Sequence, residues 1–424
     1  MTQGKQTVVT AFALFSLFFG AGNLILPPFL GYNAGESWLW VTLGFAVSAV
    51  LIPILAIYGH ARLQGTMLDF ANKVTPGFAI FYSICVYAIS ISLPSPRTAS
   101  VTYEMAIQPY FEMSSLTLST LYFAVVLIFV LNRTKIISII GKFLTPLIIL
   151  LLVAVVLIGL FSELEPMKQS LFTNSFTAGI LEGYQTFDAI GGVVVGGVII
   201  ISFNLQGKFD APEKRKMIGR AGLIAGIGLF VIYGGLIALG ASHSGTVTSS
   251  NRTELLQILS TGSLGSIGTA FLGVLVTLAC FTTAVGIVTG TADFVKGLLK
   301  DSQLAYIITA VLGCILGVAV GQWDVHYIID IALPALMFIY PITIVLILLN
   351  VTPKKLASQW VFRTVVIVTF LFSIPDFLGF LIAQEQLQGI RGWLPFANDN
   401  MGWILPALIT FVITNVVLSF RKKD

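Results

Sequence analysis

Long runs of apolar residues recur along the whole chain and are separated by short polar connections. A helix needs about 20 apolar residues to cross the hydrocarbon core of a bilayer. The pattern therefore predicts an all-α, polytopic membrane protein with about twelve spans. Their approximate bounds are 7–31, 38–59, 76–96, 115–131, 136–161, 179–203, 221–241, 264–292, 304–320, 326–349, 361–383 and 402–420. The strands of a membrane barrel would instead alternate polar and apolar residues.

The composition excludes two broad classes of protein. Only 10% of the 424 residues are charged, whereas soluble domains carry about 25%. So few charges cannot cover a water-exposed surface, which excludes a soluble enzyme. The 32 Phe and the 56% of hydrophobic residues also exclude a disordered chain.

The basic residues set the expected topology. With a cytoplasmic N-terminus, four of the 23 Lys and Arg fall in outside connections and all the others fall inside. Cytoplasmic connections are enriched in Lys and Arg, so we expect both termini in the cytoplasm. Since no connection is long enough for a soluble domain, we expect one integral membrane domain over residues 1–424. The four outside residues are Arg97, Lys168, Arg252 and Arg391.

The first span contains a signal for a broken helix, the run FFGAGNLILPP at 18–28. Glycine is costly inside a helix, and proline removes a hydrogen-bond donor. Lipid cannot satisfy the freed backbone groups, so such backbone must face protein or a wet cavity. We expect a first half that ends near Phe19, with carbonyls suited to a cation. The second half then begins near Asn23, with N–H groups suited to a carboxylate. A kinked, closely packed helix is the alternative.

The sixth span contains a second candidate break, EGYQTFDAIGG at 182–192. An ionisable side chain inside a membrane is costly, which makes Asp188 a candidate functional residue. Capping of a second half-helix is an equally good interpretation of Asp188. Glu182 is expected near the outer interface, where a solvated carboxylate costs little.

The spacing of the two breaks indicates an inverted repeat. Spans 1–5 (about 7–161) and spans 6–10 (about 179–349) each contain an odd number of crossings, so the second set runs in the opposite sense. Paired broken helices in inverted halves are typical of secondary transporters with a site at mid-membrane. The halves share little residue identity, so the repeat rests on topology and on the position of the breaks. The spans at 361–383 and 402–420 lie outside it.

Span 8 supplies oxygen atoms that suit a hard cation such as sodium. The hydroxyls of Thr282 and Thr283 and the carbonyl of Ala279 lie within one helical turn. Threonine in membrane helices also often bonds to its own helix, and that reading stays open. Asp330 and Asp376 are further intramembrane or interfacial acids, suited to a gate, a proton path or a helix cap.

Two other features shape the expectation. Pro94 and Pro96 are expected to end span 3 near the outer face. Arg97 is a candidate to contact the substrate carboxylate or a gate acid, but a solvated loop residue is the favoured interpretation. The three Cys and three His are scattered without CxxC or HExxH spacing. This argues against a disulfide framework and a metalloprotease, and no cofactor is expected. An ion channel would need a selectivity filter or rings of charge, and the sequence shows no such filter. The inverted arrangement favours alternating access instead.

Three motifs together give the chain a family resemblance. They are FFGAGNLILPP at 18–28, LPSPRTASVTYE at 93–104 and LEGYQTFDAI at 181–190. With them the chain resembles the bacterial branched-chain amino acid transport system II carriers of the BrnQ type. The resemblance covers essentially the whole chain and implies cation-coupled uptake of leucine, isoleucine and valine across the bacterial cytoplasmic membrane. A carrier for another small solute is the alternative.

That family is in turn similar to the amino acid–polyamine–cation superfamily, with the five-plus-five inverted-repeat fold of bacterial leucine transporters. The similarity implies that the unwound part of span 1 meets the substrate carboxylate, while spans 3 and 6 line the rest of the pocket. The implied substrate residues are Gly20, Ala21, Gly22, Asn23, Tyr87, Tyr184, Thr186, Phe187 and Asp188. The implied sodium ligands are the carbonyls of Ser16, Phe19 and Ala279 with the hydroxyls of Thr282 and Thr283.

The coupling ion stays open between sodium and a proton. Gln185 and Asp188 are larger and more polar than the residues many sodium-coupled relatives carry there, and Asp188 is able to carry a proton or balance the substrate ammonium. An apolar pocket separates homologous aliphatic side chains by only about 1–3 kcal/mol per methylene, so shared transport of three substrates is reasonable. We expect the lipid bilayer and the small-molecule substrate as partners, no nucleic acid, and function as a monomer.

Overall fold

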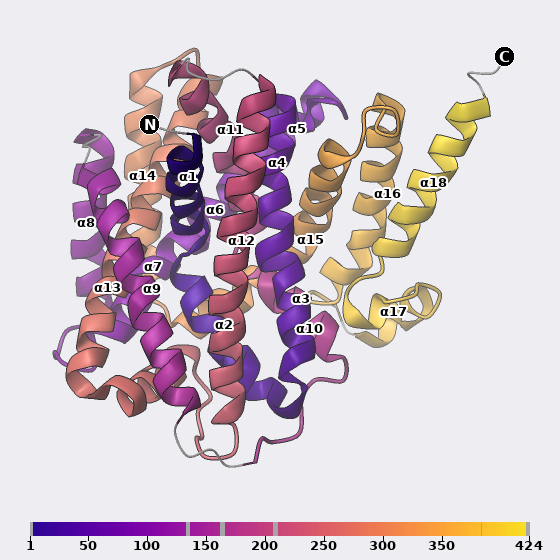
Figure 1. Ribbon diagram of the computed structural model, residues 1–424. Coiled ribbons are helices and arrows are strands. Elements are labelled where there is room, and N and C mark those ends of the chain that lie inside the picture. Colours follow the sequence, from indigo (N-terminus) through magenta and orange to yellow (C-terminus); the bar gives the residue numbers. More distant parts are fainter. Residues whose placement is uncertain (1–2, 133–135, 162–165, 207–210, 383, 421–424) are drawn as a thin grey trace.

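The computed structural model describes residues 3–132, 136–161, 166–206, 211–382 and 384–420, and these residues contain helices and no strand. The helices form one bundle (Figure 1). Up to residue 160 they are α1 (Gln3–Phe18), α2 (Ala21–Ala34), α3 (Trp38–Ala46), α4 (Ile52–Leu63), α5 (Met67–Asn72), α6 (Pro76–Ser92), α7 (Pro94–Thr102), α8 (Ser115–Asn132) and α9 (Ile136–Leu160).

The helices that follow are α10 (Ser175–Tyr184), α11 (Asp188–Gln206), α12 (Ala211–Ser242), α13 (Arg252–Leu298), α14 (Gln303–Gly321), α15 (Val325–Val351), α16 (Gln359–Leu378), α17 (Gln384–Arg391) and α18 (Ile404–Phe420). Short 3-10 turns are η1 (Gly35–Ser37) and η4 (Ala397–Asp399), and short π segments are η2 (Val47–Leu51) and η3 (Tyr103–Ile107).

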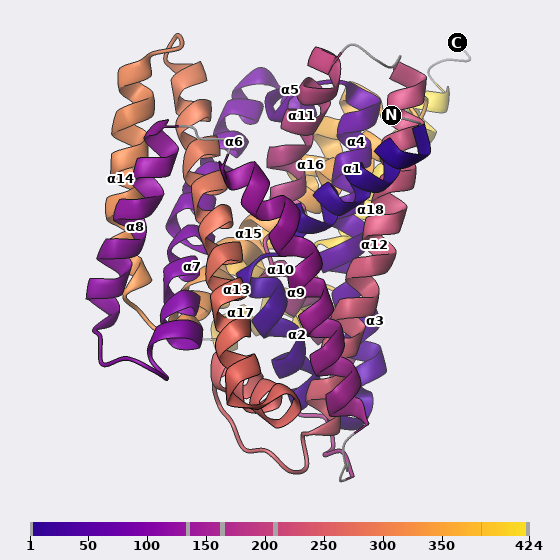
Figure 2. The ribbon, with the colours of Figure 1, turned by 60° about the vertical axis from the view of Figure 1, so that its left-hand side comes forward.

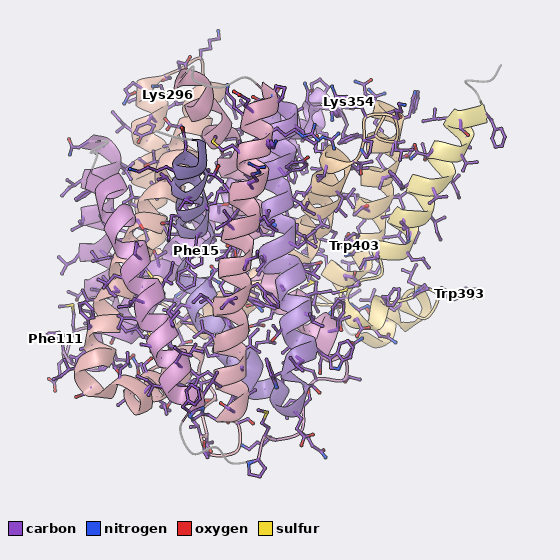
Figure 3. All side chains as sticks on the ribbon, viewed as in Figure 1. Phe15, Phe111, Lys296, Lys354, Trp393 and Trp403 are labelled. Carbon is purple, nitrogen blue, oxygen red and sulfur yellow. The ribbon has the colours of Figure 1, made fainter. Side chains whose placement is uncertain are left out.

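The outside of the bundle is apolar. Large hydrophobic side chains such as Leu121, Leu312 and Leu371 are more than half exposed on α8, α14 and α16, and such side chains project all around the molecule (Figure 3). Eight helical segments of the described chain are long and apolar enough to cross a membrane. A soluble monomer rarely exposes so much contiguous apolar surface, so the molecule is a multi-pass membrane protein.

The two broken helices, α1–α2 and α10–α11, each pack against a continuous part of the bundle. Helix α12 lies along both α1 and α2, while α10 packs on α3 and α11 on α4 (Figures 1 and 2). The start of α1 and the end of α18 lie at the same end of the molecule (Figure 1). The chain therefore brings residues of its first 60 positions against residues of 175–242 at the two breaks.

Glycines allow α2 and α12 to touch backbone to backbone. A Cβ atom on Gly31 would lie 1.9 Å from the carbonyl oxygen of Ile237, and one on Gly240 would lie 1.9 Å from that of Pro28. Small residues at helix interfaces in membranes allow this close approach, and van der Waals packing then holds the helices together. The second half of the first span is thus fixed firmly to α12.

The structure corrects the expected end of the third span. The chain does not leave the helix for a loop at Pro94 and Pro96, because a second helix, α7, begins at Pro94 and is followed by η3 up to Ile107. The first position of a helix tolerates proline, since its N–H would have no partner there. The prolines therefore restart the helix after a change of direction at Leu93, which has φ −122° and ψ −67°.

The close contact between α2 and α12 predicts a stability effect. Gly31→Ala and Gly240→Ala should each lower the apparent unfolding temperature in detergent by several degrees, because the added methyl group meets backbone that cannot move aside. A thiol-reactive dye measures this, since Cys280 and Cys314 are buried and become reactive on unfolding. Gly286→Ala is the control, because a Cβ there meets nothing within 4 Å. It should gain helix propensity of about 0.8–1.0 kcal/mol. Equal unfolding temperatures for all three variants would contradict the contact.

Candidate functional site

The first break lies between α1 and α2, at Phe19 and Gly20. Gly20 has extended backbone, with φ −113° and ψ −173°, and its amide donates to the side-chain oxygen of Asn23 at 3.3 Å. Ala21, Gly22 and Asn23 form the first turn of α2, whose amides have no partner within their own helix. The predicted break therefore agrees with the structure, and α2 begins two residues before the expected start.

The second break lies between α10 and α11, at residues 185–187. Thr186 holds it on both sides: its hydroxyl donates to the carbonyl of Gly183 at 2.8 Å and accepts the amide of Asp188 at 3.3 Å. Phe187 has φ +63°, a left-handed conformation that non-glycine residues adopt uncommonly. Such strain persists only where the surroundings hold it, and it concentrates at functional sites.

Asn23 joins the two breaks. Its side-chain nitrogen donates to Oδ2 of Asp188 at 2.5 Å and to the hydroxyl of Tyr233 at 2.6 Å. These three side chains are at most 6% exposed and come from α2, α11 and α12. Within the described chain, the Asp188 carboxylate is thus bonded across the break, and no bond from it to the first turn of its own helix is found. The capping role considered for Asp188 has no support in this geometry.

Arg97 is the residue that sequence reasoning misplaced. It was expected in a solvated loop, but it lies in α7 with only 4% of its surface exposed. Its Nη1 donates to the carbonyl of Gln185 at 2.8 Å, and its guanidinium carbon lies 5.4 Å from the centre of the Phe187 ring. A Cβ atom on Gly22 would lie 2.4 Å from its Nη2. The guanidinium therefore stands between the first turn of α2 and the second break.

The aromatic residues expected at the site divide into two groups. Tyr184 is buried beside the second break, and its ring stacks on Tyr340 of α15 at 4.3 Å between centres. Tyr87 instead stacks on Phe294 of α13 at 4.4 Å between centres. Tyr233 and Tyr340 were not predicted, because nothing local in the sequence marks a tyrosine as the partner of a residue far along the chain.

The expected cation ligands lie next to the first break. The hydroxyls of Thr282 and Thr283 both donate to the carbonyl of Ala279 at 2.9 Å. A Cβ on Gly20 would lie 3.8 Å from Oγ1 of Thr283, so α13 lies beside the break that contains Phe19 and follows Ser16 in the last turn of α1. The threonines are thus bonded to their own helix, but each hydroxyl oxygen keeps lone pairs that a cation is able to use.

A layer of charged residues lies on one side of the site. Arg252 contacts Glu182 at 3.2 Å and His326 at 2.6 Å, and its guanidinium lies over the ring of Phe29 at 4.9 Å. Gln185 donates to the other oxygen of Glu182 at 3.0 Å, which links the layer to the second break. Glu182 is thus paired with a cation and is not simply solvated.

Three other acids of the membrane region bond to residues outside the two breaks. Glu104 of η3 accepts the amide of Val325 at 2.9 Å and also the hydroxyl of Thr253, which ties α7 and η3 to the starts of α13 and α15. Asp330 lies 3.6 Å from His326, and Asp376 lies 4.0 Å from Arg391. Within the described chain, the side-chain hydrogen bonds and ion pairs of these three acids do not reach a residue of either break.

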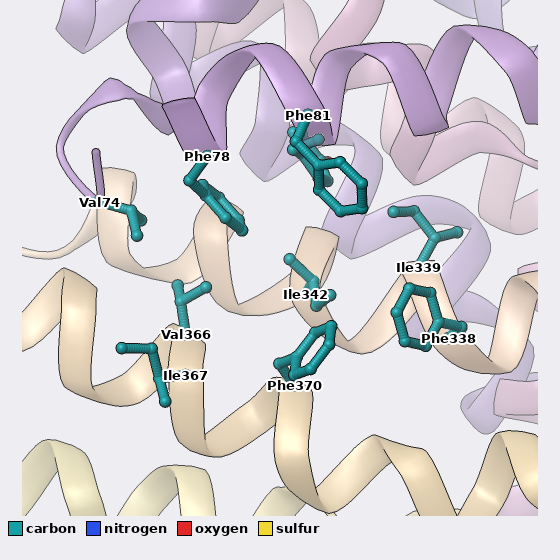
Figure 4. A pocket seen from close by; sticks show the side chains of 10 residues that line it. Val74, Phe78, Phe81, Phe338, Ile339, Ile342, Val366, Ile367 and Phe370 are labelled. Carbon is teal, nitrogen blue, oxygen red and sulfur yellow. The ribbon is translucent and has the colours of Figure 1, made fainter. Parts of the chain in front are cut away.

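A separate cavity of about 130 Å³ lies between α6, α15 and α16. Its lining includes Phe78, Phe81, Phe338 and Phe370 (Figure 4). None of the residues predicted for the substrate lines it, and its walls are apolar. It offers no charged group to either end of a zwitterion, so the breaks are the better candidate site.

Comparison with known sequences gives a consistent result. A family model described as "Branched-chain amino acid transport protein" matches residues 3–421. The chain is 31% identical over 423 residues to a branched-chain amino acid transport system 2 carrier protein of Pseudomonas aeruginosa, covering 98% of this chain and 96% of the relative. It is 32% identical over 437 residues to the branched-chain amino acid permease BrnQ of Bacillus subtilis, covering 98% and 97%.

Solved structures share the fold at low sequence identity. The inward-facing conformation of Mhp1 is similar with a TM-score of 0.63 and 13% identity, covering 97% of this chain and 91% of that one. A substrate-bound, outward-open Na⁺-coupled sialic acid symporter is similar with a TM-score of 0.60 and 11% identity, covering 97% and 90%. At this identity the likeness shows the fold alone, and the expected leucine-transporter-like architecture agrees with it.

The Asn23 contacts predict a stability effect that a double-mutant cycle detects. Asn23→Leu should lower the unfolding temperature by several degrees, because unpaired buried polar groups cost about 1–3 kcal/mol each, and charged groups cost more. Adding Asp188→Leu should restore part of the loss, since removal of both partners leaves no unpaired carboxylate. The control is Asn415→Leu, whose amide donates only to its own helix at Phe411. Additive losses in the double variant would show that Asn23 and Asp188 do not interact.

Proposed function

Because the chain belongs to the family of branched-chain amino acid transport proteins, we propose that it is a secondary active symporter that takes up leucine, isoleucine and valine. The observation that carries the proposal is the meeting of the two breaks. Asn23, Asp188 and Arg97 place polar and charged groups in the dry interior of an apolar bundle. Ionisable groups there are expensive and are by default functional.

The two breaks offer what an amino acid zwitterion needs. The substrate carboxylate binds at the amides of Ala21, Gly22 and Asn23, where the dipole of α2 favours negative charge. The ammonium binds at the Asp188 carboxylate. The rings of Phe187 and Tyr184 support this assignment, since they are buried beside the second break and offer apolar surface to a branched side chain. Gly20 and Thr186 keep the backbone of the breaks open.

The helices are proposed to form twelve spans with a five-plus-five inverted repeat. In such a repeat span 1 corresponds to span 6, and span 2 to span 7. The packing supports this, because α1 and α2 lie along α12 as α10 and α11 lie along α3 and α4. The distribution of Lys and Arg supports cytoplasmic termini in a bacterial cytoplasmic membrane. The site lies within one chain, which supports a monomer as the working unit.

Sodium is the proposed coupling ion. Thr282, Thr283 and Ala279 lie beside the first break, where the chain leaves α1 at Phe19, and hydroxyl and carbonyl oxygens are the ligands that a hard cation prefers. A proton is the second candidate. It is favoured by the bonding of both hydroxyls to their own helix and by the buried Asp188 carboxylate, which is able to carry it.

Transport then follows alternating access, in which the site opens to one side at a time. The Arg252–Glu182 pair joins α13 to α10, and His326 adds α15. If the N-terminus is cytoplasmic, this layer lies on the outer side. Its separation lets substrate enter, and its closure excludes water from the breaks.

The proposed function and its coupling are tested together in proteoliposomes. An inward sodium gradient should drive accumulation of labelled leucine, and unlabelled isoleucine and valine should compete. The double variant Thr282→Ala, Thr283→Ala should raise the sodium needed for half-maximal uptake about tenfold, because two ligand oxygens are lost. Thr410→Ala is the control, since its hydroxyl also bonds its own helix but lies in α18.

Two outcomes would contradict these proposals. Uptake that persists without sodium and collapses with a protonophore would make the proton the coupling ion. Uptake of other solutes, with no uptake of leucine, would refute the proposed substrates.

Asp188→Asn tests the role of the central carboxylate. As the ammonium partner, Asp188 supplies a charge that an amide cannot, so net uptake and leucine counterflow should both fall at least tenfold. Both are measured in the same vesicles. Loss of accumulation with intact counterflow would instead identify Asp188 as the proton carrier, because the neutral amide resembles the protonated acid. Survival of both activities would give Asp188 a structural role only.

A further inference from the structure

The Arg97 guanidinium has few hydrogen-bond partners within the described chain. An arginine carries five N–H donors, and the structure gives this guanidinium one hydrogen bond, from Nη1 to the carbonyl of Gln185 at 2.8 Å. Its Nε is buried and has no partner within the described chain. A buried cation with unused donors is costly, so a group that accepts these bonds is expected at some stage of the working cycle.

The surroundings of the guanidinium aim it at the first break. Nη2 lies 2.4 Å from the position that a Cβ of Gly22 would take, so any larger residue there would displace the guanidinium. Gly22 is also the second residue of α2, and the amides at the N-terminus of a helix favour an anion. On its other side the guanidinium lies over the ring of Phe187, 5.4 Å from its centre. Arg97 and the start of α2 therefore present positive charge to one place.

Asp188 supplies the matching negative charge. Arg97 lies against Gly22, and Asp188 bonds to Asn23, the next residue of α2, yet within the described chain the two side chains form no salt bridge. The pair is neutral overall. An amino acid zwitterion that binds between them is also neutral overall. Its carboxylate pairs with the Arg97 guanidinium, and its ammonium pairs with the Asp188 carboxylate. Neither charge is left alone in the dry interior.

We propose that Arg97 is a substrate-binding residue, which receives the carboxylate of the transported amino acid together with the first turn of α2. This deepens the proposed function and rests on it. The site then recognises zwitterions by two resident charges of opposite sign. A leucine analogue without its carboxylate brings an ammonium toward a buried cation, and an analogue without its ammonium brings a carboxylate toward a buried anion. Both are rejected on electrostatic grounds.

Competition binding tests this with three ligands of nearly the same shape. Leucine, leucinamide and 4-methyl-2-oxopentanoate compete for labelled leucine on the purified full-length protein. At about pH 6.5 the amine of leucinamide is protonated, since α-amino groups have a pKa of about 7.7–8.0. For the unchanged protein we expect leucine to be preferred over either analogue by roughly 100-fold, because charge-assisted hydrogen bonds are strong.

The measured quantity is the preference for leucine over leucinamide. In Arg97→Gln this preference should fall at least tenfold, because the carboxylate loses its cation while leucinamide loses nothing. Arg97→Lys should keep part of the preference, since the charge remains without the fork of donors. Gly22→Ala should lower it with Arg97 intact, because the methyl group displaces the guanidinium. Arg363→Gln is the control, since Arg363 also donates to a main-chain carbonyl, that of Val74, at 2.8 Å, but away from the breaks.

Each other outcome has a definite meaning. If Arg97 only holds the Gln185 carbonyl, or if water satisfies its donors, Arg97→Gln lowers the affinity for leucine and the affinity for leucinamide by the same factor. That result refutes the proposal. Should Arg97→Gln fail to fold, an unchanged preference in both Arg97→Lys and Gly22→Ala refutes it equally. If the unchanged protein binds no leucine, the proposed function itself fails, which is distinct from an unchanged preference in the variants.

Discussion

The amide of Asn23 holds the two broken helices together, and the rest of the site depends on it. Its oxygen accepts the amide of Gly20 and shapes the first turn of α2, while its nitrogen donates to Asp188 and Tyr233. Only a side chain with both donors and an acceptor makes these contacts at once. An aspartate here would place two carboxylates together in a dry interior, where they cannot both ionise. An aliphatic residue would leave all three partners unpaired.

Charge balance is the second constraint, and the membrane makes it strict. A lone charge in a low-dielectric interior costs several kcal/mol even after relaxation, so the fold can bury Arg97 only near Asp188. Their helices, α7 and α11, are far apart in the sequence, and the two side chains approach each other because Arg97 lies against Gly22 and Asp188 bonds to Asn23 in the first turn of α2. The layer of Arg252 and Glu182 follows the same rule with different helices. Each charge is tolerated because the tertiary structure brings its counter-charge.

Local signals were enough to predict an all-helical, multi-pass membrane protein and both breaks. The length of an apolar run predicts a span, and glycine and proline within it predict a break. Both effects arise from the local backbone and do not depend on the rest of the chain. Arg97 was misplaced because Pro94 and Pro96 read equally well as the end of a helix or as the start of one, and only the packing of α7 decides. Tyr233 and Tyr340 escaped prediction because their roles come from distant contacts. For the hydroxyls of Thr282 and Thr283, the structure is compatible with both predicted roles. Each hydroxyl bonds to its own helix but keeps lone pairs that a cation is able to use.

The two polar clusters differ in how easily they can be rearranged, and this difference suits a transporter. The side chains of Arg252 and Glu182 are 9% and 15% exposed, so water can replace each partner as the pair separates. Water that reaches either group as the pair separates replaces part of the lost bond and so lowers the cost of opening. The contacts of Asn23 are drier, and breaking them leaves buried groups unpaired at a higher cost. Motion that opens the charged layer therefore requires less free energy than motion that separates the two breaks. In the alternating-access cycle proposed above, the two breaks therefore stay together while the helices around them move.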